Sequence, residues 1–200
     1  MGISLWLVPP ADVAARLRRI MNMETKTSGT SFPHFPPHVT LATVKTSPEA
    51  WDTLSNAIPT HQSTIPVTFK AVKTGDTYFM SLYVEVHDTG KLHELREHLK
   101  ESLSPMPVPP IPHLSLFYID DEKPEERVEM MEELIHTNRI VERGQDNVAL
   151  DCSLPSTQDV MDDDLISGFI GAEIWIVKCD GPPNTWLSNT PLDPIKLLAE

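Results

Sequence analysis

The chain has 200 residues, of which 40% are hydrophobic and 22% charged, and this composition is typical of a globular protein and argues against global disorder. Its 16 basic and 29 acidic residues give a net charge of −13. Such a surface argues against binding of long nucleic acids, because that binding depends on neutralisation of phosphates by Lys and Arg. A small anionic ligand needs only a few donors in a cleft and is compatible with this charge.

The cysteine content and the N-terminus indicate the compartment. Cys152 and Cys179 are too few for a disulfide scaffold and form no zinc-like cluster, so we expect a reducing compartment and leave open whether they pair. The first ten residues have no basic leader, and no apolar run is long enough to span a bilayer. We therefore expect a soluble, intracellular and cytoplasmic protein without a membrane span.

The first half of the chain reads as alternating strands and helices. A strand over residues 3–8 ends at two prolines, and a helix with apolar residues at helical spacing follows over 12–23. A loop over 28–37 leads into a strand over 38–44. Ser47 and Pro48 then predict a helix start, with Ser as the N-cap.

The second half repeats this order approximately. Strands over 64–72 and 77–86 are joined by a turn, and leucines at helical spacing follow: Leu92, Leu95, Leu99 and Leu103. A Pro-rich loop precedes a strand over 113–119 and a helix over 122–137. The acidic and poorly periodic stretch over 144–171 reads as a strand or two plus a mobile surface loop, and a strand over 172–179 and a mostly irregular tail follow. The likeness of the halves predicts two similar α+β lobes within one domain of residues 1–200.

The likeness is sharpest at two five-residue stretches, Pro37-His38-Val39-Thr40-Leu41 and Pro112-His113-Leu114-Ser115-Leu116. Both follow a Pro-rich loop and open a predicted strand. Because side chains alternate across a strand, each stretch offers an imidazole and a hydroxyl on one face and an aliphatic pair on the other. One His-x-Thr means little by itself, since most exposed histidines do no chemistry. Its repetition in the same pattern favours a shared site.

Two such units facing each other suit hydrolysis of a phosphodiester. Among His38 and His113, one neutral imidazole can take a proton from water and one protonated imidazole can give a proton to the departing ribose oxygen. The hydroxyls of Thr40 and Ser115 can donate hydrogen bonds to the non-bridging phosphate oxygens. This arrangement requires no metal and no cofactor.

The paired motifs resemble those of the 2H phosphoesterase superfamily. The closer likeness is to fungal 2',3'-cyclic-nucleotide 3'-phosphodiesterases, and it includes Ser4-Leu5-Trp6-Leu7-Val8-Pro9, Tyr118 and the late Trp175-Ile176-Val177 strand. The resemblance implies a bilobal α+β fold in which two pseudo-symmetric lobes with antiparallel sheets face a central cleft and helices lie outside. It also implies catalytic His38 and His113, with Thr40, Ser115 and Tyr118 at the phosphate.

The implied activity is metal-independent opening of cyclic phosphates on ribose. Such enzymes convert 2',3'-cyclic nucleotides to nucleoside 2'-phosphates, and ADP-ribose 1'',2''-cyclic phosphate, a by-product of tRNA splicing, to ADP-ribose 1''-phosphate. We accordingly expect a monomer that binds a small cyclic-phosphate nucleotide and no cofactor. Fungal relatives have been placed at the Golgi, but nothing in these residues encodes that address.

Several points stay open at this level. We assign His113 as the general base and His38 as the general acid, although pseudo-symmetry allows the reverse. Tyr118 lies five residues after His113, so strand alternation puts it on the opposite face unless a bulge or twist intervenes. The acidic segment 120–171 is long for the fold and reads as an insertion or lid. Among the aromatic residues, which read mostly as core, Trp6 or Phe79 is the expected stacking partner for a base.

Three other functions are compatible with parts of the pattern. The same site could act on RNA ends, which the negative charge disfavours. A module could bind cyclic phosphates without turnover, but a pure binder needs no paired acid and base. Finally, a duplicated fold could carry no site at all.

Overall fold

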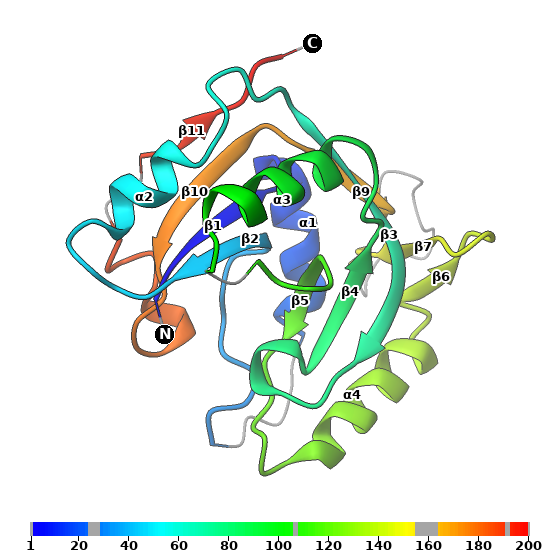
Figure 1. Cartoon of the computed structure of the whole chain (residues 1–200). Helices are drawn as coiled ribbons and strands as arrows, with labels where there is room; N and C mark the ends of the chain where they lie inside the picture. Colours follow the sequence, from blue (N-terminus) through cyan, green and yellow to red (C-terminus); the bar gives the residue numbers. More distant parts are fainter. Residues whose placement is uncertain (1, 24–28, 106–107, 155–163, 191–192, 200) are drawn as a thin grey trace.

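The structure is a computed structural model that describes residues 2–23, 29–105, 108–154, 164–190 and 193–199. Its centre is one eight-stranded antiparallel sheet with the strand order β11-β10-β1-β2-β5-β4-β3-β9 (Figure 1). Four helices pack on this sheet. The α+β class predicted from the sequence is therefore confirmed.

The sheet consists of two halves that meet at β2 and β5. One half contains β1 (Ile3–Val8), β2 (Val39–Val44), β10 (Glu173–Lys178) and β11 (Ile195–Lys196). The other contains β3 (Ile65–Thr74), β4 (Leu82–Val86), β5 (His113–Phe117) and β9 (Gly168–Gly171). A single residue pair, Val39 with Leu114, joins β2 to β5, so the two motif strands lie side by side at the junction of the lobes.

The helices bury apolar residues that recur at helical spacing. They are α1 (Ala11–Met21), α2 (Ala50–Asn56), α3 (Gly90–Ser102) and α4 (Pro124–His136). In α3, Leu92, Leu95 and Leu99 are buried on the side that packs against β2 and β3. No helix in the described part of the chain combines the length and apolarity needed to cross a membrane.

The segment 120–171 contains the predicted helix, α4, and short strands within the stretch for which one or two strands were predicted. Besides α4 and the edge strand β9, it contains a small antiparallel sheet of β6 (Ile140–Glu142), β7 (Val148–Asp151) and β8 (Leu165–Ile166). Residues 155–163, within the acidic stretch, lie outside the described residues. The proposal that this segment is an insertion or lid stays a prediction.

Two local predictions differ from the structure. Ser47 does not cap α2: the N–H of Ala50 bonds to the Ser47 carbonyl in a preceding turn, and the helix begins at Ala50 after Glu49. The tail, predicted to be mostly irregular, has among its described residues only the short strand β11 and the 3₁₀ helix η3 (Pro183–Thr185). The predicted strand over 77–86 opens instead with a 3₁₀ turn, η1 (Tyr78–Met80).

The turn η1 is held by a buried serine hydroxyl. Ser81 Oγ lies within hydrogen-bonding distance of the carbonyl oxygens of Thr77, Tyr78 and Ile119, and it accepts a hydrogen bond from the Ile119 N–H. A buried hydroxyl needs such hydrogen-bond partners. Two of them, the carbonyls of Thr77 and Tyr78, belong to η1, and the third belongs to Ile119 after β5. The bonds fix η1 against the end of β5.

Candidate active site

Both motif strands contain a one-residue β-bulge at the leucine of the motif. Leu5 pairs with Ala42 and Trp6 with Thr40, so Leu41 is the extra residue in β2. In the other lobe, Leu82 pairs with Phe117 and Tyr83 with Ser115, so Leu116 is extra in β5. A bulge reverses the alternation of side chains beyond it.

The bulges decide which residues share a face with the histidines. In each strand, the residue five positions after the histidine returns to the histidine's side of the sheet; these residues are Thr43 and Tyr118. The face that strand alternation alone assigned to Tyr118 is therefore wrong, and the bulge is the reason. The aliphatic residues Val39, Leu41, Leu114 and Leu116 are fully buried, as their place in the motifs predicts.

One cavity of about 380 Å³ contains all five residues that the sequence singled out, a volume within the range of small-molecule sites. Because β2 and β5 run antiparallel through the pair of Val39 and Leu114, His38 lies across from Ser115, and His113 lies across from Thr40. The described residues that line the cavity are Gly2, Ser4, Trp6, His38, Thr40, Thr43, Thr77, Phe79, Met80, Pro109, His113, Ser115, Tyr118, Cys179 and Trp186.

The two imidazoles are held in the same way by the backbone. Nδ1 of His38 lies 2.7 Å from the carbonyl oxygen of Pro36, and Nδ1 of His113 lies 2.8 Å from that of Ile111, each two residues earlier. A carbonyl oxygen can only accept a hydrogen bond, so Nδ1 carries the proton in the neutral ring. Nε2 is then the nitrogen that can exchange a proton with a ligand.

An aromatic residue of the neighbouring strand supports each imidazole. Trp6 stacks on His38 with ring centroids 3.7 Å apart and an interplanar angle of 10°. Tyr83, which holds the equivalent place in the other lobe, meets His113 edge to face at 5.2 Å. Trp6 is 1% exposed and His38 covers its ring, so our expectation that Trp6 stacks on a base is wrong.

Phe79 is more exposed than the core position that the sequence analysis gave most aromatic residues. Its side chain is 46% exposed, and it lines the cavity beside Tyr118 and Trp186. Because its ring is accessible at the edge of the cavity, Phe79 remains the expected stacking partner for a base.

Burial sets the protonation of the two histidines. It lowers the pKa of His38 to about 3, against the opposing effect of the Pro36 carbonyl, and the charge of His113 lowers it further. Burial also lowers the pKa of His113. Burial therefore favours the neutral form of both rings near pH 7. A phosphate anion between them would favour their charged forms and allow one ring to hold a proton.

The buried state of His38 makes stability depend on pH. Below pH 6.5 the unfolded chain protonates this imidazole, whereas the folded chain keeps it neutral down to about pH 3, so stability falls as the pH drops through this window. We expect the contribution of His38 to be about 1.4 kcal/mol at about pH 5.5. Urea unfolding at neutral pH and at this pH measures it: wild type should lose about that much more than His38→Gln. Equal losses would contradict the burial of a neutral His38.

The hydroxyl groups of the site are available as donors. Ser115 Oγ donates to the Phe79 carbonyl at 3.1 Å, a bond that a ligand oxygen could replace. Tyr118 is buried and stacks on Phe35 with centroids 4.0 Å apart, and burial raises the pKa of its phenol, which keeps the donor protonated. Thr40 is partly exposed to the cavity.

Sequence reasoning missed several residues of the cavity. Thr43 lies on the cavity side, and its Oγ1 is 2.9 Å from Ser4 Oγ. The signal that could have found it is the constant spacing of 75 residues between the motifs, which pairs Thr43 with Tyr118 as it pairs the two histidines. Trp186 and Cys179 come from the chain after β10 and carried no local signal.

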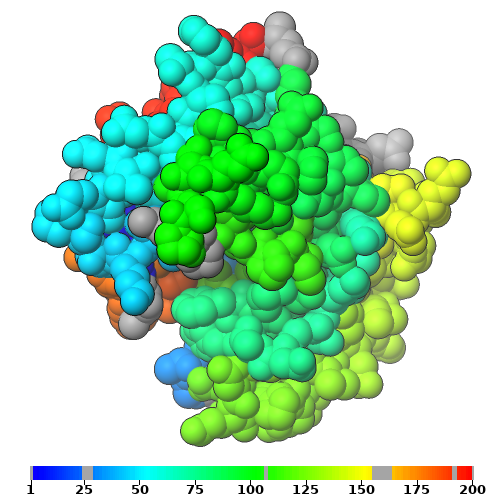
Figure 2. Space-filling model, in the orientation of Figure 1, coloured from blue at the N-terminus to red at the C-terminus, as the bar shows by residue number. Residues whose placement is uncertain are grey.

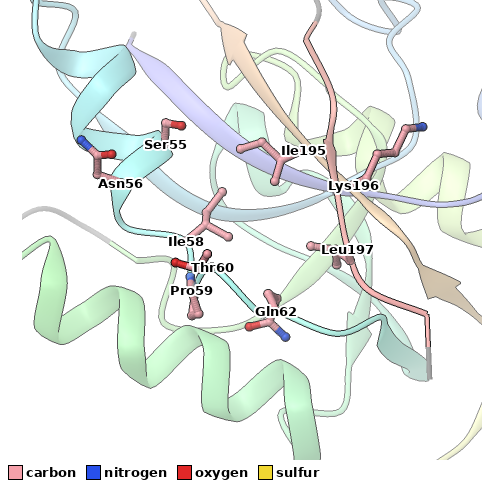
Figure 3. Close-up of a pocket in the computed structure, with 9 residues that line it drawn as sticks. All are labelled: Ser55, Asn56, Ile58, Pro59, Thr60, Gln62, Ile195, Lys196 and Leu197. Carbon is pink, nitrogen blue, oxygen red and sulfur yellow. The ribbon is translucent and has the colours of Figure 1, made fainter.

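The other pockets lack this chemistry. The pocket in Figure 3 has a volume of about 280 Å³, and its one charged side chain, Lys196, is paired with Glu173. Its lining contains no histidine and consists of Ser55, Asn56, Ile58, Pro59, Thr60, Gln62, Ile195, Lys196 and Leu197. Within the described ranges, no group of three or more His, Cys, Asp or Glu side chains is placed to hold a metal ion.

Comparison with known families decides which group of proteins the chain falls in. The model of the family described as "Cyclic phosphodiesterase-like protein" matches residues 1–190. The chain belongs to this family. The resemblance to the 2H phosphoesterases seen in the paired motifs is thereby confirmed, whereas the closer likeness to fungal enzymes stays a prediction.

The chain of this family member was also compared with solved structures and with curated proteins. It is similar to the crystal structure of E. coli LigT complexed with 3'-AMP, with a TM-score of 0.49 and 14% sequence identity over 98% of this chain and 95% of that chain. No curated protein matches the chain.

Proposed function

We propose that this protein hydrolyses cyclic phosphates on ribose without a metal. The substrates are 2',3'-cyclic nucleotides, converted to nucleoside 2'-phosphates, and ADP-ribose 1'',2''-cyclic phosphate, converted to ADP-ribose 1''-phosphate. One observation carries the proposal: two histidines, each with Nδ1 on a backbone carbonyl, share one cavity with two hydroxyl side chains of the same motifs.

The reaction follows from the roles these groups can take. Nε2 of one neutral histidine accepts a proton from water as the water oxygen bonds to phosphorus. The bond between phosphorus and O3' breaks, and the other histidine, protonated while the anion is bound, gives its proton to O3'. The 2'-phosphate remains on the ribose. The pair then holds the same number of protons as before, with the proton on the opposite ring.

Donors beside the phosphate stabilise the charge that develops on its oxygens. Thr40 and Ser115 flank the histidines from opposite strands, so each can donate to one non-bridging oxygen. The buried phenol of Tyr118 is a further neutral donor. We keep His113 as base and His38 as acid, and the near-symmetry of the two rings leaves the reverse order open.

The test is hydrolysis of 2',3'-cyclic AMP with and without a chelator, with the product identified as the 2'- or 3'-phosphate. We expect turnover that resists the chelator and gives the 2'-phosphate, because the site's own side chains supply both proton transfers. A folded protein that binds the nucleotide without turnover would instead indicate a binding module. Loss of turnover with the chelator, or a 3'-phosphate product, would contradict the proposal.

A further inference from the structure

Arg96 is a fully buried cation in a chain of strongly negative net charge. It lies on α3, and its side chain is 0% exposed. Its Nε donates to Asp88 Oδ1 at 3.1 Å, and its Nη2 lies 2.9 Å from the carbonyl oxygen of Pro109 and 3.3 Å from that of Pro110. A guanidinium is retained in an interior only where such partners replace water.

The two carbonyls belong to the loop that delivers His113 to the cavity. Pro109 lines the cavity, and Ile111 supplies the carbonyl that orients the imidazole of His113. Three of the four residues at 109–112 are prolines and have no N–H, so the loop has few donors of its own with which to bond to the rest of the fold. The guanidinium supplies donors from outside the loop.

The other histidine is held differently. His38 is stacked on Trp6 and lies against Phe35, whereas the aromatic contact of His113 within the described ranges is the edge contact with Tyr83. His113 is therefore the ring whose orientation depends more on its preceding loop. Figure 2 shows residues of α3, which carries Arg96, gathered on one face of the molecule.

We infer that Arg96 is a positioning residue for His113: by holding the carbonyls of Pro109 and Pro110, it fixes Ile111 and thereby the Nδ1–H tautomer and the orientation of the imidazole. The expected effect of Arg96 on kcat rests on the proposed function, whereas its expected effect on the His113 ring does not.

The charged and titratable neighbours of His113 come from three elements. Tyr83 and Glu85 lie on β4, and the Glu85 carboxylate is paired with Lys70 and Lys73. His38 lies on β2. Arg96 acts from α3: burial lowers the pKa of His113, the Ile111 carbonyl opposes this, and the Arg96 charge lowers the pKa further. Loss of that charge should therefore raise the pKa of His113.

The test measures the ring nitrogens directly, by NMR of the two histidines in wild type, Arg96→Lys and Arg96→Met. Lysine keeps the charge but lacks the planar fork that reaches both carbonyls and Asp88. In Arg96→Lys, we expect His113 to change from the Nδ1–H form to a mixture of tautomers while His38 keeps its signal. In Arg96→Met, the pKa of His113 should also rise. If the methionine variant does not fold, the lysine variant decides.

Kinetics and a matched control complete the test. In Arg96→Lys, kcat for 2',3'-cyclic AMP should fall about 10- to 100-fold with KM changed less than about threefold, because the ring is misplaced rather than the substrate lost. Arg139→Lys, in a partly buried arginine that bonds to the carbonyls of Asp151 and Ser153, should leave the His113 signal and kcat unchanged.

Three outcomes would overturn the inference. They are an unchanged His113 tautomer in a folded Arg96→Lys, an equal change in both histidines, and the same change in Arg139→Lys. An inactive wild type would overturn only the proposed function, because the NMR comparison needs no turnover.

Discussion

Replacement of His113 by glutamine should lower kcat for 2',3'-cyclic AMP by about 10²- to 10⁴-fold, because glutamine cannot transfer a proton in the transition state. The same loss is expected for His38→Gln, since the two rings occupy equivalent places across the β2–β5 junction. Steady-state kinetics with purified variants, alongside circular dichroism to confirm folding, measure the effect.

A control distinguishes loss of chemistry from loss of a histidine in general. His136 lies exposed at the end of α4, away from the cavity, so His136→Gln should keep the wild-type kcat. Full activity in a folded His113→Gln would contradict the mechanism. A large loss in only one of the two motif variants would show that the pair does not act as acid and base.

Removal of one motif hydroxyl should cost about 10²- to 10³-fold in kcat, which is the usual effect of deleting a donor to a developing oxyanion. We expect this for Thr40→Val, which keeps the shape of the side chain, and for Ser115→Ala. Ser115 Oγ donates to the Phe79 carbonyl, so its alanine variant also leaves that acceptor without this donor. KM should change much less than kcat in both variants.

The conservative variant of Thr40 tests the reason for that loss. Thr40→Ser keeps the hydroxyl and loses only the methyl group, so its kcat should lie within about tenfold of wild type. Equal losses in Thr40→Ser and Thr40→Val would show that packing of the methyl group matters and that the hydroxyl does not contact the phosphate.

The parts of the site that the sequence predicted are those encoded by local periodicity. Alternation placed His38 with Thr40 and His113 with Ser115, and it placed the aliphatic residues between them in the core, as the structure has them. The repetition of one pattern in both halves predicted the two lobes. These features depend only on residues near one another in the chain.

The parts that could not be predicted depend on partners far away in the chain. The bulges at Leu41 and Leu116 appear only in the pairing with β1 and β4, and they decide that Tyr118 faces the cavity. Trp6 reads as a free aromatic until the neighbouring strand places His38 on its ring. The contacts of Arg96 with the carbonyls of Pro109 and Pro110 join α3 to a loop that the sequence analysis did not connect with it.

The central claim is that His38 and His113 act as one acid and one base. The most direct test is the pH dependence of kcat for 2',3'-cyclic AMP in wild type, His38→Gln and His113→Gln, because kcat reports the protonation of the two rings with the phosphate bound. We predict a bell-shaped wild-type profile whose rising limb reports deprotonation of the base and whose falling limb reports deprotonation of the acid. The residual activity of each variant should lack one limb, a different limb for each histidine, which also assigns the roles. Profiles that keep both limbs in either variant, or that lose the same limb in both, would contradict the two-histidine mechanism.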